Sequence, residues 1–132
     1  MIHRVIGIAG WVMDIIFAVE RYDKDGVLGC LYDAGAPAWI MERSEEIMDA
    51  GQPNSGFTFT NADKRRGVIV IGPTDSGDQT INTTVHEIRH MADGIAKELG
   101  VPLDSEEPAY MSGDVAMELA DIICERCCRE CV

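Results

Sequence analysis

Residues 81–100 read INTTVHEIRHMADGIAKELG and carry a sustained hydrophobic pattern. Apolar side chains recur at intervals of three and four, at Ile81, Val85, Ile88, Ala92, Ile95 and Leu99. This spacing is typical of the buried face of an amphipathic α-helix. Gly100 follows the last apolar position, so the pattern predicts a helix that ends there. Asp78, a few residues upstream, is the predicted N-cap of this helix.

Two histidines leave the predicted helix on the side away from its apolar face. His86 stands two residues before Ile88, about 200° around the axis, and His90 follows one turn later. Two imidazoles in this arrangement can share one tetrahedral zinc ion. With Glu87 they form the pattern HExxH, in which the glutamate accepts a proton from water at the metal. The pattern predicts a zinc site with Glu87 as general base. A helix whose polar face happens to hold two histidines is the alternative.

A catalytic zinc usually takes three protein ligands, and the third decides the subclass. The metzincin pattern requires a glycine three residues after His90, where this chain has Asp93. The remaining histidine of the chain is His3. The other candidates are carboxylates that follow the helix, namely Glu106, Glu107, Asp114 and Glu118. An antiparallel helix pair would bring residues 113–118 level with the histidines, whereas Glu106 needs the loop 100–105 to climb back toward them.

The first half of the chain is predicted to form strands and one helix. Residues 2–8 and 11–19 are apolar runs, read as a strand pair or as a strand and a helix. Asp25-Gly26 is a hairpin signal, so residues 27–32 are predicted to be a returning strand. Residues 37–51 are predicted to be a helix, and FTFT (57–60) and VIVIG (68–72) to be short strands.

A last helix is predicted to open at Asp104, which forms a capping box with Glu107. The order of elements predicts a single domain over residues 1–132 of the α+β class. In it, a small antiparallel or mixed sheet packs against the HExxH helix and a C-terminal helix.

Charge and composition exclude several classes of function. The formal net charge is −12, which argues against nucleic-acid binding, and the short basic run 64–66 is read as a solvated loop. The apolar N-terminal run lacks a convincing cleavage site, and a membrane span there would bury Asp14. We therefore expect a cytoplasmic protein that binds neither membrane nor nucleic acid.

The cysteines form a lone Cys30 and a cluster, CERCCREC, at Cys124, Cys127, Cys128 and Cys131. The four clustered positions share one helical stripe, and thiolates on one straight helix cannot easily surround a single ion. We expect this stripe to be a core or interface face, with metal or redox use and a homodimer contact as less favoured alternatives of similar weight.

Residues 82–114, NTTVHEIRHMADGIAKELGVPLDSEEPAYMSGD, resemble small HExxH metallopeptidase-like proteins of phages, prophages and bacterial mobile elements. The shared pattern is HExxH, a short helix, a Gly-containing turn and Glu-x-x-Ala-Tyr. The likeness extends upstream to about residue 54. The Glu-x-x-Ala step is also similar to the zinc-binding glutamate of the ImmA/IrrE metallopeptidases, which carry Asn where this chain has Tyr110.

This resemblance implies a zincin-like fold of the gluzincin type, with Zn²⁺ on His86, His90 and Glu106. It implies a peptide or protein substrate. Tyr110 would then hydrogen-bond the developing oxyanion, and a packed aromatic side chain is the equally favoured alternative. Asp93 would orient a ligand imidazole, although an aspartate at such a position is more often solvated. Two further hypotheses stay open: a non-catalytic zincin-like binding module, and a helix pair without metal.

Overall fold

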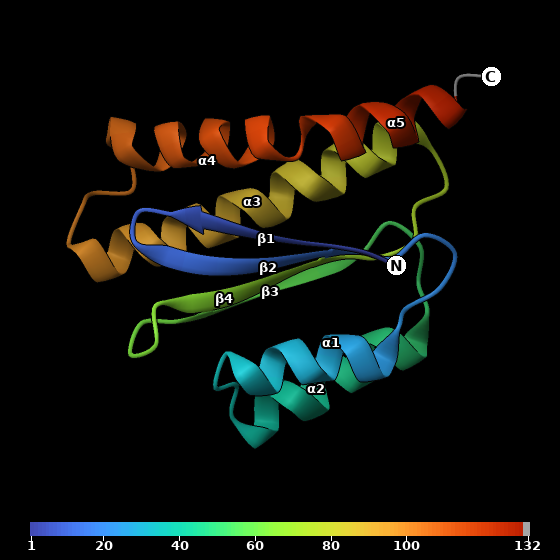
Figure 1. Ribbon diagram of the computed structural model, residues 1–132, viewed down its shortest axis with the longest axis horizontal. Helices are drawn as coiled ribbons and strands as arrows, with labels where there is room; N and C mark the ends of the chain where they lie inside the picture. Colours follow the sequence, from blue (N-terminus) through green and yellow to red (C-terminus); the bar gives the residue numbers. More distant parts are fainter. Residues whose placement is uncertain (131–132) are drawn as a thin grey trace.

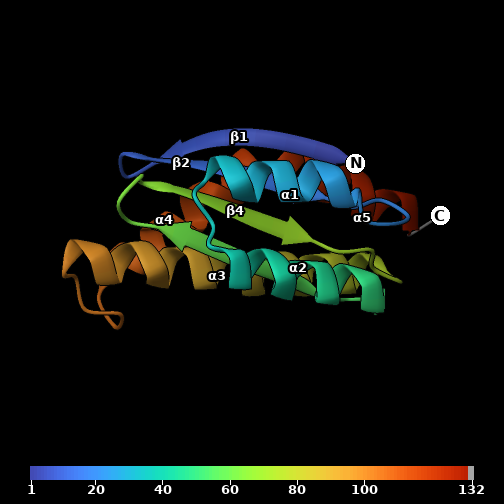
Figure 2. The same ribbon diagram turned by 90° about the horizontal axis from the view of Figure 1, so that it is seen from below.

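The computed structural model describes residues 1–130, with side chains described through Arg126. These residues form a mixed four-stranded sheet with helices on both faces, so the predicted α+β class is confirmed (Figure 1). The strands are β1 (Ile2–Ile8), β2 (Trp11–Phe17), β3 (Gly56–Asn61) and β4 (Arg66–Ile71). One face carries α3 (Gly77–Leu99), α4 (Glu106–Glu118) and α5 (Ala120–Glu130). The opposite face carries α1 (Lys24–Asp33) and α2 (Ala38–Ala50), which lie side by side in Figure 2.

The sheet is built from two antiparallel hairpins joined by a parallel pair. The strand order is β1-β2-β4-β3, with β2 and β4 parallel. Ala9 and Gly10 connect β1 to β2 with positive φ angles of 52° and 82°, as a tight hairpin turn requires. The short strands predicted at residues 57–60 and 68–72 are confirmed, and of the two readings of the N-terminal runs the strand pair is the one that forms. This order puts β1 and β3 at opposite edges of the sheet.

Alternation along β2 divides the core between the two faces. Met13, Ile15 and Phe17 are fully buried on the α3 side, whereas Ile16 packs with the cluster on the α1 side. The α3-side cluster is completed by helical residues at one-turn spacing, among them Ile88, Met91, Ile95 and Val115. The sheet is thus covered on both faces, and its strands are correspondingly apolar.

The buried face of α3 differs from the predicted stripe. Ile81, Val85 and Leu99 are 46%, 57% and 52% exposed, although Ile88, Ala92 and Ile95 are buried as expected. The face that meets the sheet is rotated and includes polar side chains, namely Thr80, Thr83, Thr84 and Glu87. The first turns of α3 pack on the loop before β3 through hydroxyl groups, since Thr83 Oγ1 donates to the Asn54 carbonyl at 3.4 Å. The spacing of apolar residues in the sequence cannot predict burial of this kind, because the buried side chains are polar.

Two predicted helix caps are wrong. Ser76, and not Asp78, caps α3, because its hydroxyl accepts the Gln79 N–H at 3.2 Å. The N-cap of α4 is Ser105, which makes no side-chain cap bond, so the capping box predicted at Asp104 does not form.

The predicted strand over residues 27–32 is also wrong, because this segment belongs to α1. Asp23 caps that helix by accepting the Gly26 N–H at 3.1 Å, so the apparent turn signal lies in the first helical turn. Val27 and Leu31, one turn apart, are its buried residues. The helix predicted over residues 37–51 is confirmed as α2, which ends at Gly51 with a φ of 60°.

The predicted single C-terminal helix is interrupted at Leu119, which is fully buried, so α4 and α5 are separate helices. The Arg4 guanidinium on β1 joins them to the sheet, donating to both Asp121 carboxylate oxygens and to the Glu118 carbonyl. Cys124 is exposed, which excludes it from the core. The side chains of Cys127 and Cys128, and all of Cys131, lie outside the described part. None of the described helices is long and apolar enough to span a bilayer.

Candidate metal centre on α3

The His–Glu–His turn lies in the middle of α3 with both histidines facing solvent. His86 Nε2 and His90 Nε2 are 3.0 Å apart, and the two rings meet edge to face with centroids 4.6 Å apart. One ligand-type atom from each of His86, Glu87 and His90 lies within 4.8 Å of the others. The predicted orientation of the histidines away from the core is therefore confirmed.

Glu87 is buried, with only 4% of the residue exposed. The Thr58 hydroxyl on β3 lies 3.0 Å from Glu87 Oε1 and 3.2 Å from the Glu87 backbone carbonyl. Gly56, at the start of β3, lets the strand approach the helix. A Cβ atom there would lie 2.5 Å from the Val70 carbonyl oxygen and 3.3 Å from Glu87 Oε2. The strand thus fixes one carboxylate oxygen and leaves the other beside a residue without a side chain.

Two adjoining hollows run along β3 beside this turn. One, of about 430 Å³, is lined by β3 from Gly56 to Thr60 and by His86, Glu87 and His90. The other, of about 290 Å³, shares Gly56, His86 and Glu87 and continues along the loop before β3. The histidine pair therefore opens onto a depression whose far wall is the edge strand.

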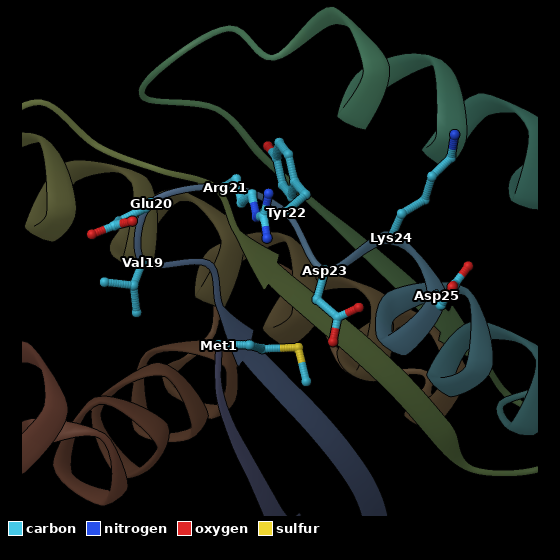
Figure 3. A pocket seen from close by; sticks show the side chains of 8 residues that line it. All are labelled: Met1, Val19, Glu20, Arg21, Tyr22, Asp23, Lys24 and Asp25. Carbon is cyan, nitrogen blue, oxygen red and sulfur yellow. The ribbon is translucent and has the colours of Figure 1, made fainter.

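A larger hollow, of about 840 Å³, lies under the connection between β2 and α1 (Figure 3). Its lining side chains point in different directions: Glu20 turns away from the others, and Lys24 reaches toward α2, where it pairs with Asp49 at 2.8 Å. A catalytic site needs polar groups that converge. The smaller hollows beside α3 meet this condition and the larger one does not.

The carboxylates predicted as third ligands lie on α4, on another flank of α3. Asp114 and Glu118 line a hollow with residues 6–8 of β1, at the sheet edge opposite β3. The described side chains do not bring Glu106, Glu107 or Asp114 into the histidine group. The antiparallel pairing of two helices predicts how far along the α3 axis a residue of α4 lies, but not the side of α3 on which α4 packs. Here α4 packs on a side of α3 other than the one that carries the histidines. Tyr110 is 65% exposed on the same helix.

The loop over residues 100–105 contacts α3 at Arg89, the residue before His90. The Leu103 carbonyl accepts a bond of 3.2 Å from Arg89 Nη2. Arg89 Nε also lies 2.9 Å from Asp93 Oδ1, so Asp93 pairs with a guanidinium and not with a ligand imidazole. The loop thus contacts α3 through the Arg89 side chain, but it does not bring Glu106 into the histidine group.

His3, the remaining histidine, lies with the other face of the sheet and cannot complete the α3 group. Its Nε2 is 2.7 Å from Asp14 Oδ1 and 3.9 Å from Cys30 Sγ. Arg66, read from the sequence as part of a solvated loop, donates to Asp14 Oδ2 at 3.2 Å. Burial raises the pKa of the Cys30 thiol, and the Asp14 carboxylate raises it further. No sequence motif indicates this cluster, because its members come from β1, β2, α1 and β4.

Comparison of the chain with protein-family models, with curated proteins and with solved structures finds no match.

Proposed function

We propose that this protein is a cytoplasmic zinc metallopeptidase, of the small mobile-element type that residues 82–114 resemble. The observation that carries the proposal is the pairing of unlike environments on one helical turn. His86 and His90 are exposed with their Nε2 atoms 3.0 Å apart, while Glu87 between them is buried against β3. Ligands open to solvent beside a positioned carboxylate are what a metal-assisted hydrolase needs.

The donor set fits zinc. Two imidazole nitrogens on one face of a helix are common zinc ligands, and their closeness lets one ion reach both after a small opening of the pair. The proposed holders are His86 and His90. Bound zinc would supply Lewis acidity, which acidifies water and polarises a carbonyl group. Glu106 is proposed as the third ligand because the resemblance assigns it that role. Its carboxylate lies outside the histidine group, so the loop that contacts Arg89 would have to move for Glu106 to bind the ion.

Glu87 is proposed as the general base. Thr58 engages Oε1, so Oε2, which faces Gly56 and the hollow, is the oxygen available to accept a proton from the attacking water. The same oxygen can then return that proton to the departing amine, as in general acid–base catalysis. The buried position of Glu87 keeps competing solvent away from the carboxylate.

The substrate class is proposed from the edge strand. β3 ends the sheet, and its outer backbone groups have no strand partner within residues 1–130. An extended peptide can add to such an edge by main-chain hydrogen bonds. Because the hollow between β3 and α3 contains both histidines, a peptide bound there would present its backbone carbonyls to the metal.

The test separates metal binding from hydrolysis. We expect the chain carrying Cys30→Ser, which removes the thiol of the His3 cluster, to bind about one equivalent of zinc, and we expect that zinc to be lost when His86→Ala is added. Glu87→Gln should keep zinc and lower the cleavage of a mixed peptide library by about 10²-fold or more, the usual contribution of a general base. Glu98→Gln, an exposed substitution on the same helix, is the matched control.

Each outcome of these measurements decides a hypothesis. Zinc binding by the Cys30→Ser chain that survives His86→Ala would rule out the α3 metal site and favour a helix pair without metal there. Zinc binding with no difference between wild type and Glu87→Gln on any peptide would favour a non-catalytic binding module. Glu106→Ala with unchanged zinc affinity, alongside the Asp114→Ala control, would remove Glu106 from the ligand set.

A further inference from the structure

A second group of metal-ligand side chains converges on the face of the sheet that carries α1. His3 comes from β1, Asp14 from β2 and Cys30 from α1. One ligand-type atom of each, an imidazole nitrogen, a carboxylate oxygen and a thiol sulfur, lies within 4.8 Å of the other two. Three elements distant in sequence thus direct three different donor types at one point.

The geometry distinguishes ligation from nucleophilic catalysis. In a cysteine–histidine–aspartate catalytic arrangement, the carboxylate holds one ring nitrogen and the thiol approaches the other. Here the same atom, His3 Nε2, is 2.7 Å from Asp14 Oδ1 and 3.9 Å from Cys30 Sγ. An imidazole cannot relay a proton between two groups that share one of its nitrogens. Donor atoms that converge on one position have the arrangement of ligands around a metal ion.

The carboxylate at the centre is positioned before any ligand arrives. Asp14 has a side chain that is 6% exposed, and Arg66 holds its Oδ2 at 3.2 Å, which leaves Oδ1 directed at His3. A neighbour that fixes a ligating carboxylate is a regular feature of protein metal sites. The Asp14, Asp33 and Asp23 carboxylates each disfavour the Cys30 thiolate, and the Arg66 guanidinium favours it. The local field therefore favours an added cation.

We propose that His3, Asp14 and Cys30 form a second metal site, selective for a borderline-soft divalent transition ion such as Zn²⁺. A nitrogen, an oxygen and a sulfur donor together suit zinc and disfavour magnesium and calcium, which take oxygen ligands. Zinc ligands in a tetrahedron lie about 3.3–3.6 Å apart. His3 and Asp14 must therefore separate slightly and Cys30 must move closer. The His3 side chain is 34% exposed, so a fourth position is open to solvent.

The experiment uses the full chain with the other ligand groups removed. His86→Ala and His90→Ala eliminate the α3 site. Cys30 is left as the one thiol by Cys124→Ser, Cys127→Ser, Cys128→Ser and Cys131→Ser. The probe is Co²⁺, because a thiolate ligand adds a near-ultraviolet charge-transfer band to its spectrum. We expect one equivalent to bind with that band and to be displaced by Zn²⁺.

Single substitutions in this background assign the ligands. Cys30→Ser should abolish the band, and His3→Ala should weaken cobalt binding by more than about tenfold, the least effect seen even for residues that only orient ligands. Asp25→Asn, an exposed substitution in the first turn of α1, is the control and should bind cobalt as the background does. Circular dichroism verifies the fold of each variant.

Two results would overturn the proposal. One is a folded background chain that develops no thiolate band at any cobalt concentration. The other is a band or affinity that His3→Ala leaves unchanged. Because His3 and Cys30 are both partly exposed, these variants can be judged without substituting the buried Asp14. The background already lacks the α3 histidines, so failure here does not bear on the proposed peptidase site.

Discussion

Each face of the sheet holds a buried carboxylate beside histidine, and the two are stabilised in different ways. Glu87 on α3 receives a side-chain hydrogen bond from one neutral group, the Thr58 hydroxyl. Asp14 on β2 is paired with the Arg66 guanidinium and with His3. A buried charge with a cationic partner is compensated, whereas one held by a neutral donor retains part of its desolvation cost. The compensated charge of Asp14 suits structure and ligand binding, whereas the less compensated Glu87 suits a group that must accept a proton.

The largest effect on stability is expected from Asp14→Asn. The substitution keeps the shape of the side chain but leaves the Arg66 guanidinium without its counter-charge and removes the carboxylate that His3 contacts. Breaking such a pair is strongly destabilising when buried, and the partial exposure of both partners reduces the cost to about 2 kcal/mol. Denaturant unfolding of the metal-free chain measures it. Asp33→Asn is the exposed control, and an equal loss in the two variants would refute the compensation argument.

Thr58→Val should have the next largest effect, because it removes the hydroxyl that Glu87 accepts and leaves that carboxylate without its donor. We expect a loss of about 1.5 kcal/mol, within the range for hydrogen bonds to charged groups. Peptide hydrolysis should fall while zinc content stays constant, since neither histidine is touched. Thr60→Val, the next residue of β3 on the same face, is the matched control. If both variants lose the same stability, the Thr58–Glu87 bond is not the cause.

Glu87→Gln gives the sharpest contrast with Asp14→Asn. The amide oxygen still accepts the Thr58 hydroxyl, and the buried charge is gone. Stability should therefore be unchanged or rise by up to about 1 kcal/mol, the pattern of a group kept for function at the expense of stability. Thermal and denaturant unfolding at neutral pH provide the measurement. A loss greater than 1 kcal/mol would place Glu87 in the same class as Asp14 and end the comparison.

The two clusters also show what a sequence can and cannot reveal. His86, Glu87 and His90 lie within five residues, so helical periodicity alone predicted their orientation. The His3–Asp14–Cys30 group depends on the β1–β2 register, in which Val5 faces Asp14, and on α1 folding over the sheet. Residues 27–32 were predicted as a strand, which removed Cys30 from that position. Residues that are far apart in the sequence and meet only in the folded chain form no spacing pattern that sequence analysis could detect.

The errors at α3 and α4 have a different physical origin. Periodicity gives the direction of a residue around one helix axis, and it does not say which neighbour stands on each flank. Thr83 is buried where its hydroxyl donates to the Asn54 carbonyl in the loop before β3, whereas Val85 is left in solvent. The expected approach of Asp114 to the histidines fails for the same reason, since α4 lies against β1.

The smallest effect is expected from Asp121→Asn, at the exposed counterpart of the Asp14 pair. Arg4 donates to both Asp121 oxygens, at 2.8 and 2.9 Å, and lowers the pKa of that carboxyl from 3.8 to about 2. A lowered native pKa stabilises the fold above the unfolded-state value, and this contribution disappears as the pH falls through the native one. Wild type should thus exceed Asp121→Asn slightly at pH 6, with the difference vanishing between about pH 4 and pH 2.

Salt should also reduce this difference, because an exposed ion pair is screened and the Asp14 pair much less so. Thermal unfolding of Asp121→Asn and Asp14→Asn, each compared with wild type at low and high ionic strength, measures this. Asp114→Asn on α4 is the exposed acidic control. If Asp121→Asn retains its full effect in high salt, Arg4 holds α5 to β1 by more than charge. The hydrogen bond from Arg4 to the Glu118 carbonyl would then be the next interaction to test. Arg4→Lys is the variant for this test, because it keeps the positive charge and loses the bidentate geometry.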